Sequence, residues 1–250
     1  MNRLKAALGR HELQVGLWQS LANPYTAEIC ASAGFDWLLF DGEHSPNTLG
    51  TLLAQLQAVS AYPVEAVGRP PIGDPVVIKQ YLDIGFRSLL IPMVTSASEA
   101  RLLVSATRFP PHGIRGVAGL TRAAGFGAHA EYLANAHQDI CLILQIESKS
   151  GLDAIAGIAA IDGVDALFIG PSDLAAALGH LGNPSHPNVQ DAILGAIGTV
   201  RKAGKPVGIF ATSAEAAKRY AAAGASFISV GTDIGLLSAG ARALKAATKS

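Results

Sequence analysis

The chain has 250 residues, of which half are hydrophobic and 15% are charged, and 19 lysines and arginines balance 19 aspartates and glutamates. This composition can bury a sizeable core, which excludes wholesale disorder. A formal net charge of zero argues against nucleic-acid binding through a general basic surface and against an electrostatic membrane anchor. We interpret Cys30 and Cys141 as reduced core thiols, because both lie in apolar stretches. Without an apolar run of ~18 residues or a signal-like start, the chain is expected to be cytoplasmic.

Short apolar segments of strand length recur along the chain. Several are apolar almost throughout, as at residues 37–40 and 142–144. Continuous rather than alternating hydrophobicity is typical of strands that are buried on both faces of a parallel sheet. The predicted strands cover residues 14–18, 36–41, 64–69, 87–92, 141–147, 165–170, 206–210 and 226–230.

Amphipathic or alanine-rich segments separate these strands. They predict helices at residues 25–33, 48–60, 75–84, 97–106, 151–158, 189–203 and 214–223, with a leucine- and alanine-rich last helix at 234–247. The pairs Asn23-Pro24 and Asp74-Pro75 are typical of an N-cap followed by the first helical residue. Gly34, Gly85 and Gly224 follow predicted helices, where glycine readily takes the left-handed conformation that ends a helix.

The alternation of eight strands with helices predicts an α/β fold, namely a single (β/α)8 TIM barrel domain over residues 1–250. A doubly wound sheet is the alternative. No G-x-G-x-x-G motif follows the first predicted strand, however, and the chain contains no Walker A motif. Residues 107–140 form a long connection rich in glycine and alanine, and long connections of this kind are often functional or face a partner.

Polar and ionisable residues gather at the C-terminal ends of the predicted strands, which is where barrels of this kind carry their active sites. These residues are Asp41, Glu43 and His44 after the second strand, Arg69 at the end of the third, Gln145 and Glu147 at the end of the fifth, and Ser172 and Asp173 after the sixth. The pattern predicts a catalytic site rather than a merely solvated surface.

Glu147 and Asp173 lie about one βα unit apart, so both are expected at the same mouth of the barrel. Two carboxylates there repel each other unless a cation lies between them. Ligation by oxygen alone suits a hard divalent ion such as Mg²⁺ or Mn²⁺, and Co²⁺ also accepts oxygen ligands. The alternative interpretation is that Asp173 only caps the helix that follows it.

Arg69 stays charged in any setting and can contact a carboxylate or a developing oxyanion. The alternative is a structural ion pair with Asp41 or Glu43. His44 is the natural candidate for a general acid or base, because its pKa can be tuned near neutrality, although a lone loop histidine is often only solvated. Lys149, in the loop after the fifth strand, leaves a Schiff-base mechanism open as a less favoured choice.

Two aromatic residues end predicted strands. Trp18 closes the first strand and Phe210 closes the seventh. Both are candidates for shaping a substrate pocket, and both are equally compatible with plugging the barrel interior.

These residues together resemble the HpcH/HpaI family of metal-dependent (class II) pyruvate aldolases. The resemblance runs in order from about residue 4 to residue 245, and the combination of D-G-E-H with Q-I-E and I-G-P-S-D-L makes it specific. The matching segments are GLW at 16–18, FDWLLFDGEH at 35–44, VGRP at 67–70, GIRGV at 113–117, QIE at 145–147 and FIGPSDL at 168–174. The resemblance implies reversible cleavage of 4-hydroxy-2-oxo acids to pyruvate, or a substituted pyruvate such as hydroxypyruvate, and an aldehyde, through a metal-stabilised enolate.

The resemblance also implies how the metal and the substrate are held. Glu147 and Asp173 would hold the divalent ion, and the substrate carboxylate and 2-oxo oxygen would chelate it. The side chain of Gln145 and the backbone around Ser172 would assist. Ser172 stands where many of these aldolases have alanine, and Phe210 stands where an aliphatic residue is frequent, which would narrow the pocket.

Further roles follow from the same resemblance. Arg69 would stabilise the enolate oxygen and His44 would act as acid and base, directly or through a water. Asp83 matches the family acid that raises the basicity of the histidine. Asp41 and Glu43 would organise the waters of the metal.

At the level of assembly, the resemblance implies a homohexamer, built as a dimer of trimers, with an exchanged C-terminal helix. The expected partners are a small oxo acid and an aldehyde, with no nucleic acid and no membrane. One alternative is a citrate-lyase-β-like lyase that acts on a CoA thioester, although no clear basic cluster supports CoA binding. A non-catalytic barrel that only binds an oxo acid is a further alternative.

Overall fold

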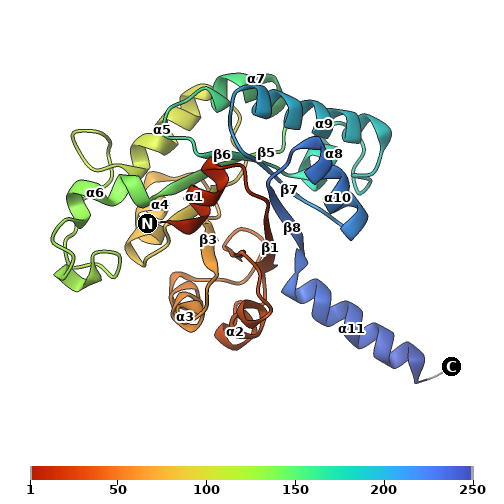
Figure 1. Cartoon of the computed structure of the whole chain (residues 1–250), viewed down its shortest axis with the longest axis horizontal. Helices are drawn as coiled ribbons and strands as arrows, with labels where there is room; N and C mark the ends of the chain where they lie inside the picture. The colour runs from red at the N-terminus through yellow and green to blue at the C-terminus, as the bar shows by residue number, and fades with distance from the viewer. Residues whose placement is uncertain (1, 249–250) are drawn as a thin grey trace.

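The computed structural model describes residues 2–248 and confirms the predicted (β/α)8 barrel. Within this range, eight parallel strands follow one another around a closed barrel, with the helices outside them (Figure 1). Strand β1 (Gln14–Gln19) pairs with both β2 (Trp37–Asp41) and β8 (Phe227–Thr232), and this closure excludes the doubly wound alternative. The expected domain limits of 1–250 stay a prediction, since residues 1, 249 and 250 lie outside the described part.

The strands lie where the hydrophobic runs predicted them, within one or two residues at each end. β2, β4 (Ser88–Ile91), β5 (Cys141–Ile146) and β6 (Ala166–Ile169) are buried along their whole length, as continuous hydrophobicity implied. The remaining strands are β3 (Glu65–Arg69) and β7 (Val207–Phe210). Cys141 is buried in β5, and both it and the half-buried Cys30 are free thiols.

The predicted helices form with the expected signals at their ends. The side chains of Asn23 and Asp74 accept hydrogen bonds from backbone amides in the first turns of α2 and α4. Gly34, Gly85 and Gly224 have φ values of 84°, 110° and 104°, which confirms the predicted left-handed ends. These helices are α2 (Pro24–Ser32), α3 (Leu49–Val59), α4 (Pro75–Asp83), α5 (Ala97–Thr107), α7 (Lys149–Ala159), α9 (Pro187–Lys202) and α10 (Ala214–Ala223).

Short helices escaped the sequence reasoning. α1 (Arg3–Gly9) precedes the first strand, and α6 (Tyr132–Asp139) lies within the long connection, together with the 3₁₀ turn η1 (Gly125–Gly127). Each is too short to show a clear helical repeat of apolar residues. The helix expected to start at Asp173 does form, as α8 (Pro171–Ala177), and it begins two residues before Asp173.

Helix α1 closes the N-terminal end of the barrel. Its Leu4 and Leu8 belong to the cluster of buried side chains inside the strands, where Trp37 stacks on Phe227 at 4.1 Å between ring centroids. Gly16 makes room for this stack, because a Cβ at that position would collide with the Trp37 ring. Side chains therefore fill the N-terminal end of the barrel, and the C-terminal mouth is the end that can hold an active site.

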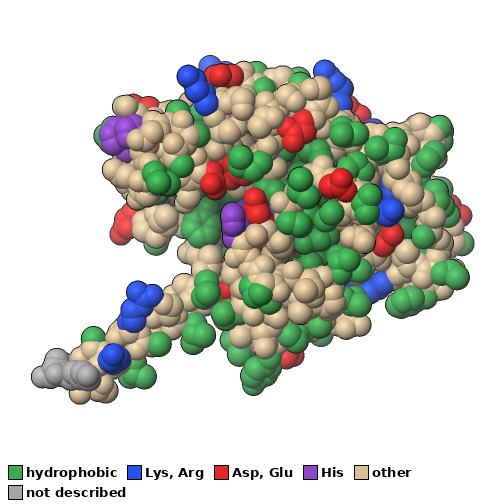
Figure 2. Space-filling model, turned by 180° about the vertical axis from the view of Figure 1, so that it is seen from behind, with side chains coloured by type: hydrophobic (Ala, Val, Ile, Leu, Met, Phe, Trp, Pro, Cys, Tyr) green, Lys and Arg blue, Asp and Glu red, His purple; other side chains and the backbone are tan. Residues whose placement is uncertain are grey.

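The last helix, α11 (Asp233–Ala247), extends away from the barrel (Figures 1 and 2). Leu236, Leu237 and Leu244 on it are more than half exposed. Its first residue is buried, and the Asp233 carboxylate accepts hydrogen bonds from the amides of Ser20 (2.8 Å) and Leu21 (3.1 Å). The base of the helix is thus fixed to the loop after β1, while its length carries unpartnered leucines. No helix among residues 2–248 is long and apolar enough to cross a membrane.

Candidate active site

The inner faces of β2 and β3 change from apolar to charged at the barrel mouth. Leu39 and Val67 belong to the buried interior cluster. Side chains alternate along a strand, so Asp41 and Arg69, two positions further on, face the same space. The two are register partners across β2 and β3, and both are buried.

Arg69 is held by two carboxylates. Its Nε and Nη2 donate to the two Asp41 oxygens at 2.8 Å each, and its Nη1 lies 2.7 Å from Glu43 Oε2. Its guanidinium carbon lies 4.2 Å from the ring centroid of Trp18. The ion pairs considered from sequence are therefore present, and they orient the guanidinium at the mouth.

Aromatic rings form one wall of this space. Trp18 packs edge-on against Phe210 at 5.5 Å between centroids and tilts against Phe168 at 6.2 Å. Trp18 is buried with the interior cluster, whereas Phe210 is only half-buried at its edge. Trp18 thus fills the barrel interior near the C-terminal mouth. The Phe210 ring is more exposed at this mouth than the Trp18 ring.

Glu147 is the buried acid of the site, and it follows β5. Its Oε1 accepts a hydrogen bond from the backbone amide of Met93 at 2.8 Å, and its Oε2 accepts one from Gln145 Nε2. Burial raises the pKa of Glu147 to about 7, with the negative charges of Asp173 and Glu43 acting in the same direction. Burial also raises the pKa of Glu43, although Arg69 opposes this shift.

Two contacts to Glu147 were not foreseen from the sequence. Met93 presents its amide from a left-handed backbone conformation, with φ of 57°. Gly170 lies so close that a Cβ would collide with Glu147 Oε2. No residue type in the sequence indicates that a backbone amide such as that of Met93 will bind a carboxylate. Gly170, directly after an apolar strand, was a signal that could have indicated a close approach to Glu147.

The carboxylates at the mouth repel one another, and a divalent cation between them would relieve this repulsion. The charges of Glu43, Glu147 and Asp173 act on one another, and Gln145 Oε1 is a buried acceptor without a hydrogen-bond partner among the described residues. Within residues 2–248, no group of three or more histidine, cysteine or acidic side chains is placed to hold a metal by itself. Two carboxylates with water and substrate oxygens remain the donor set that suits a hard ion.

The raised pKa of Glu147 makes the stability of the metal-free protein depend on pH. An acid whose pKa is higher in the folded state makes its full contribution to stability at pH values below its pKa in the unfolded state, near 4.5. This contribution is lost as pH rises through the pKa of the folded state, about 7. Relative to Glu147→Gln, the wild type should lose about 3 kcal/mol of unfolding free energy between pH 5 and pH 9. Urea titrations in a chelator would measure this difference, and a constant difference across that range would contradict it.

The other residues expected at the mouth are more exposed. The side chain of His44 is 68% exposed, and its Nε2 lies 3.8 Å from Glu43 Oε2. Ser172 and Asp173 are exposed in the first turn of α8, whose N-cap is Gly170. Asp173 is therefore not the N-cap residue of that helix. Its negative charge contributes to the raised pKa of Glu147.

Asp83 is not brought to this mouth within one chain. It ends α4, at the opposite end of the barrel, and its Oδ1 accepts a hydrogen bond from Arg115 Nη2 at 2.7 Å. Arg115 is fully buried, also donates to the Tyr132 hydroxyl and lies over the Phe109 ring. Its expected action on His44 therefore requires a second copy of the chain.

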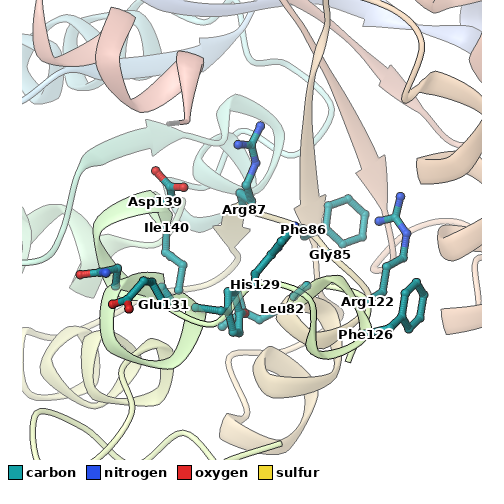
Figure 3. A pocket seen from close by; sticks show the side chains of 14 residues that line it. Leu82, Gly85, Phe86, Arg87, Arg122, Phe126, His129, Glu131, Asp139 and Ile140 are labelled. Atoms are coloured by element: carbon teal, nitrogen blue, oxygen red, sulfur yellow. The ribbon is translucent and has the colours of Figure 1, made fainter. Parts of the chain in front are cut away.

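A pocket of about 630 Å³ also lies at that opposite end (Figure 3). It is bounded by the end of α4, the segment that joins α4 to β4, and helix α6, with Arg122 and Phe126 of the long connection along one side. None of the residues predicted for catalysis or binding lines it. We therefore place the candidate active site at the charged C-terminal mouth rather than in this pocket.

The fold and the mouth define a (β/α)8 barrel with a paired arginine facing clustered carboxylates. Residues 14–239 match the family model described as HpcH/HpaI aldolase/citrate lyase. A hydroxypyruvate/pyruvate aldolase of Deinococcus radiodurans is 53% identical over 249 residues, covering 99% of this chain and 90% of that protein. A 4-hydroxy-2-oxo-heptane-1,7-dioate aldolase of Salmonella dublin is 51% identical, covering 98% and 94%.

A solved structure agrees with these sequence matches. The crystal structure of an HpcH/HpaI aldolase/citrate lyase family protein from Burkholderia cenocepacia superposes with a TM-score of 0.97 at 42% identity, covering 100% of both chains. The chain belongs to the HpcH/HpaI aldolase/citrate lyase family, as its motifs implied.

Proposed function

We propose that this protein is a divalent-metal-dependent (class II) aldolase. It reversibly cleaves 4-hydroxy-2-oxo acids into pyruvate, or a substituted pyruvate such as hydroxypyruvate, and an aldehyde. The observation that carries the proposal is the buried Glu147, whose pKa is raised first by burial and further by the charges of Asp173 and Glu43, at the same mouth as the oriented guanidinium of Arg69. The activities named for the relatives from Deinococcus and Salmonella support the substrate class.

Mg²⁺ or Mn²⁺, with Co²⁺ as a further candidate, would be held by Glu147 and Asp173 and would supply Lewis-acid stabilisation of negative charge on oxygen. Gln145 and the backbone around Ser172 would help to position the oxo acid. Breaking the C3–C4 bond leaves an electron pair that delocalises onto the 2-oxo oxygen. Arg69 would stabilise that charge, because Asp41 already fixes its guanidinium and little reorganisation is needed.

Proton transfer falls to the turn after β2. As the C3–C4 bond breaks, the 4-hydroxyl group must lose its proton to become the aldehyde carbonyl, and the enolate then takes a proton at C3. His44, exposed at the mouth, would accept the first proton and deliver the second, directly or through one water. Glu43 lies between Arg69 and His44 and would order water around them together with Asp41. Phe210 and Trp18 would bound the aldehyde side of the pocket.

The assembly is part of the same proposal. Because Asp83 lies at the far end of its own barrel, a role beside His44 implies a neighbouring subunit. The projecting α11, with exposed leucines, supports an exchanged helix in a homohexamer built as a dimer of trimers. A cytoplasmic location, with small-molecule substrates as the other partners, is also proposed.

Deuterium exchange into the pyruvate methyl group tests the enolate half-reaction without the correct aldehyde. Protein stripped with EDTA is incubated with pyruvate in D₂O, with and without Mn²⁺ or Mg²⁺, and followed by NMR. We expect exchange only when metal is added. Exchange that is indifferent to metal would contradict the metal dependence, and no exchange with any metal would contradict pyruvate as the nucleophile.

His44→Ala should slow this exchange by about 10²–10⁴-fold, the usual contribution of general acid–base catalysis. Mn²⁺ affinity should stay at the wild-type value, because His44 is not among the proposed ligands. His112→Ala is a control, since His112 is exposed in the long connection. An unchanged exchange rate in His44→Ala would assign the proton transfer to another group.

A further inference from the structure

The turn that carries Glu43 and His44 is joined to helix α3 by one side-chain amide. Asn47 Nδ2 donates to the carbonyl oxygen of Asp41 at 2.8 Å and to Ser45 Oγ at 3.0 Å. Its Oδ1 accepts from Thr51 Oγ1 at 2.9 Å and from Gln55 Nε2 at 2.7 Å. Asn47 thus satisfies groups on both sides and links the end of β2 to the body of α3.

The α3 side of this link is buried and hydrogen-bonded within the helix. Gln55 is 1% exposed, and its Nε2 also donates to the Thr51 carbonyl at 3.0 Å. Leu52 and Leu56 on the same helix are buried in the core between helices and sheet. A hydrogen bond to a buried amide that is held in this way fixes the position of its partner.

The turn is also confined on its opposite side. A Cβ at Gly42 would collide with the Tyr81 hydroxyl and would lie 2.8 Å from the Arg69 carbonyl oxygen, so the backbone runs directly along β3 and α4. The amide of Glu43 donates to Asp41 Oδ1 at 3.0 Å, which couples the turn to the carboxylate that holds Arg69. Movement of the Asp41 carbonyl would therefore displace the proton-transfer turn and the arginine pair together.

We propose that Asn47 is a positioning residue for enolisation. It holds the Asp41 carbonyl against α3, and so places Glu43 and His44 over the mouth, without touching substrate or metal itself. The inference rests on the proposed aldolase function for its kinetic consequence, whereas its structural part, the anchoring of the turn, stands apart from any activity.

Two substitutions separate the two sides of the link. Asn47→Asp keeps an acceptor for Thr51 and Gln55 but turns an oxygen toward the Asp41 carbonyl. Asn47→Ala removes the hydrogen bonds to the turn and those to α3. It is the variant to measure in the same experiments if Asn47→Asp does not fold. The matched control is Asn23→Ala, because Asn23 accepts from the amides of Tyr25 and Thr26 in the first turn of α2 and has no hydrogen bond to the turn.

We expect Asn47→Asp to lower kcat for metal-dependent pyruvate exchange by about 10-fold or more, with KM and Mn²⁺ affinity within about twofold of wild type. Amide hydrogen exchange of residues 42–45 should accelerate, while the peptide of α3 keeps its protection. Asn23→Ala should change neither measurement. A purely structural role would instead lower thermal stability without this separation of kcat from KM.

An Asn47→Asp variant with kcat within about twofold of wild type would overturn the proposal. If the wild type itself exchanges no pyruvate proton, the aldolase proposal fails. The amide-exchange measurement then decides the positioning claim alone, and unchanged protection of residues 42–45 in Asn47→Asp would reject it. The two failures are therefore distinguishable.

Discussion

Replacing Glu147 by glutamine is expected to lower metal-dependent pyruvate exchange by at least about 100-fold, because a metal contributes several kcal/mol to charge stabilisation and Glu147 is its proposed buried ligand. Glutamine has the same shape and keeps an oxygen for the Met93 amide, so the fold should be retained. It lacks the negative charge that attracts a cation. Asp173→Asn, which also removes a proposed ligand charge, should weaken Mn²⁺ binding as well. Because Asp173 is exposed, this substitution should not affect folding.

The matched control for this change is Glu99→Gln. Glu99 follows the neighbouring strand β4, and its Oε2 also accepts a backbone amide hydrogen bond, from Thr95 at 2.9 Å. Exchange rate and Mn²⁺ affinity, the latter by calorimetry, should match the wild type in this control. Wild-type exchange with Mn²⁺ in Glu147→Gln would show that Glu147 is not a ligand.

Replacing Arg69 should damage both stability and catalysis. Arg69→Ala leaves the buried Asp41 and the half-buried Glu43 without their cation, and breaking a buried pair in this way costs about 3–5 kcal/mol of unfolding free energy. Loss of an oriented donor at a developing oxyanion should lower kcat by about 10²–10³-fold. Arg69→Lys keeps the charge but cannot reproduce the two-pronged contact with Asp41, so its kcat should fall nearly as far.

A second substitution separates the two effects. Asp41→Asn combined with Arg69→Ala removes the more deeply buried of the two unpaired charges, so denaturant titration should show part of the lost stability restored while kcat stays low. Arg10→Ala is the control, since its pair with Glu12 is exposed and should affect neither quantity. An Arg69→Lys variant with wild-type kcat would reduce the role of Arg69 to a simple counter-charge.

The strands and the mouth could be predicted because their signals are local. A strand buried on both faces is apolar along most of its length, and the ionisable or amide side chains at its C-terminal end mark its approach to the mouth of the barrel. Asp41, Arg69, Gln145 and Glu147 were found in this way, and the structure places all four at one mouth. Asp83 illustrates the limit, because its expected role came only from a family resemblance, and its own chain holds it at the other end of the barrel, against Arg115.

The sequence by itself determined the order of strands and helices, the glycine and N-cap residues that end them, and which charged residues follow which strand. Each of these depends on periodicity or on contacts within a few residues. The tertiary structure alone decided that Asp41 and Arg69 pair, that the Met93 amide reaches Glu147, and that α11 leaves the barrel. These contacts join residues far apart in the chain, and closure of the barrel sets their distances, so no local pattern records them.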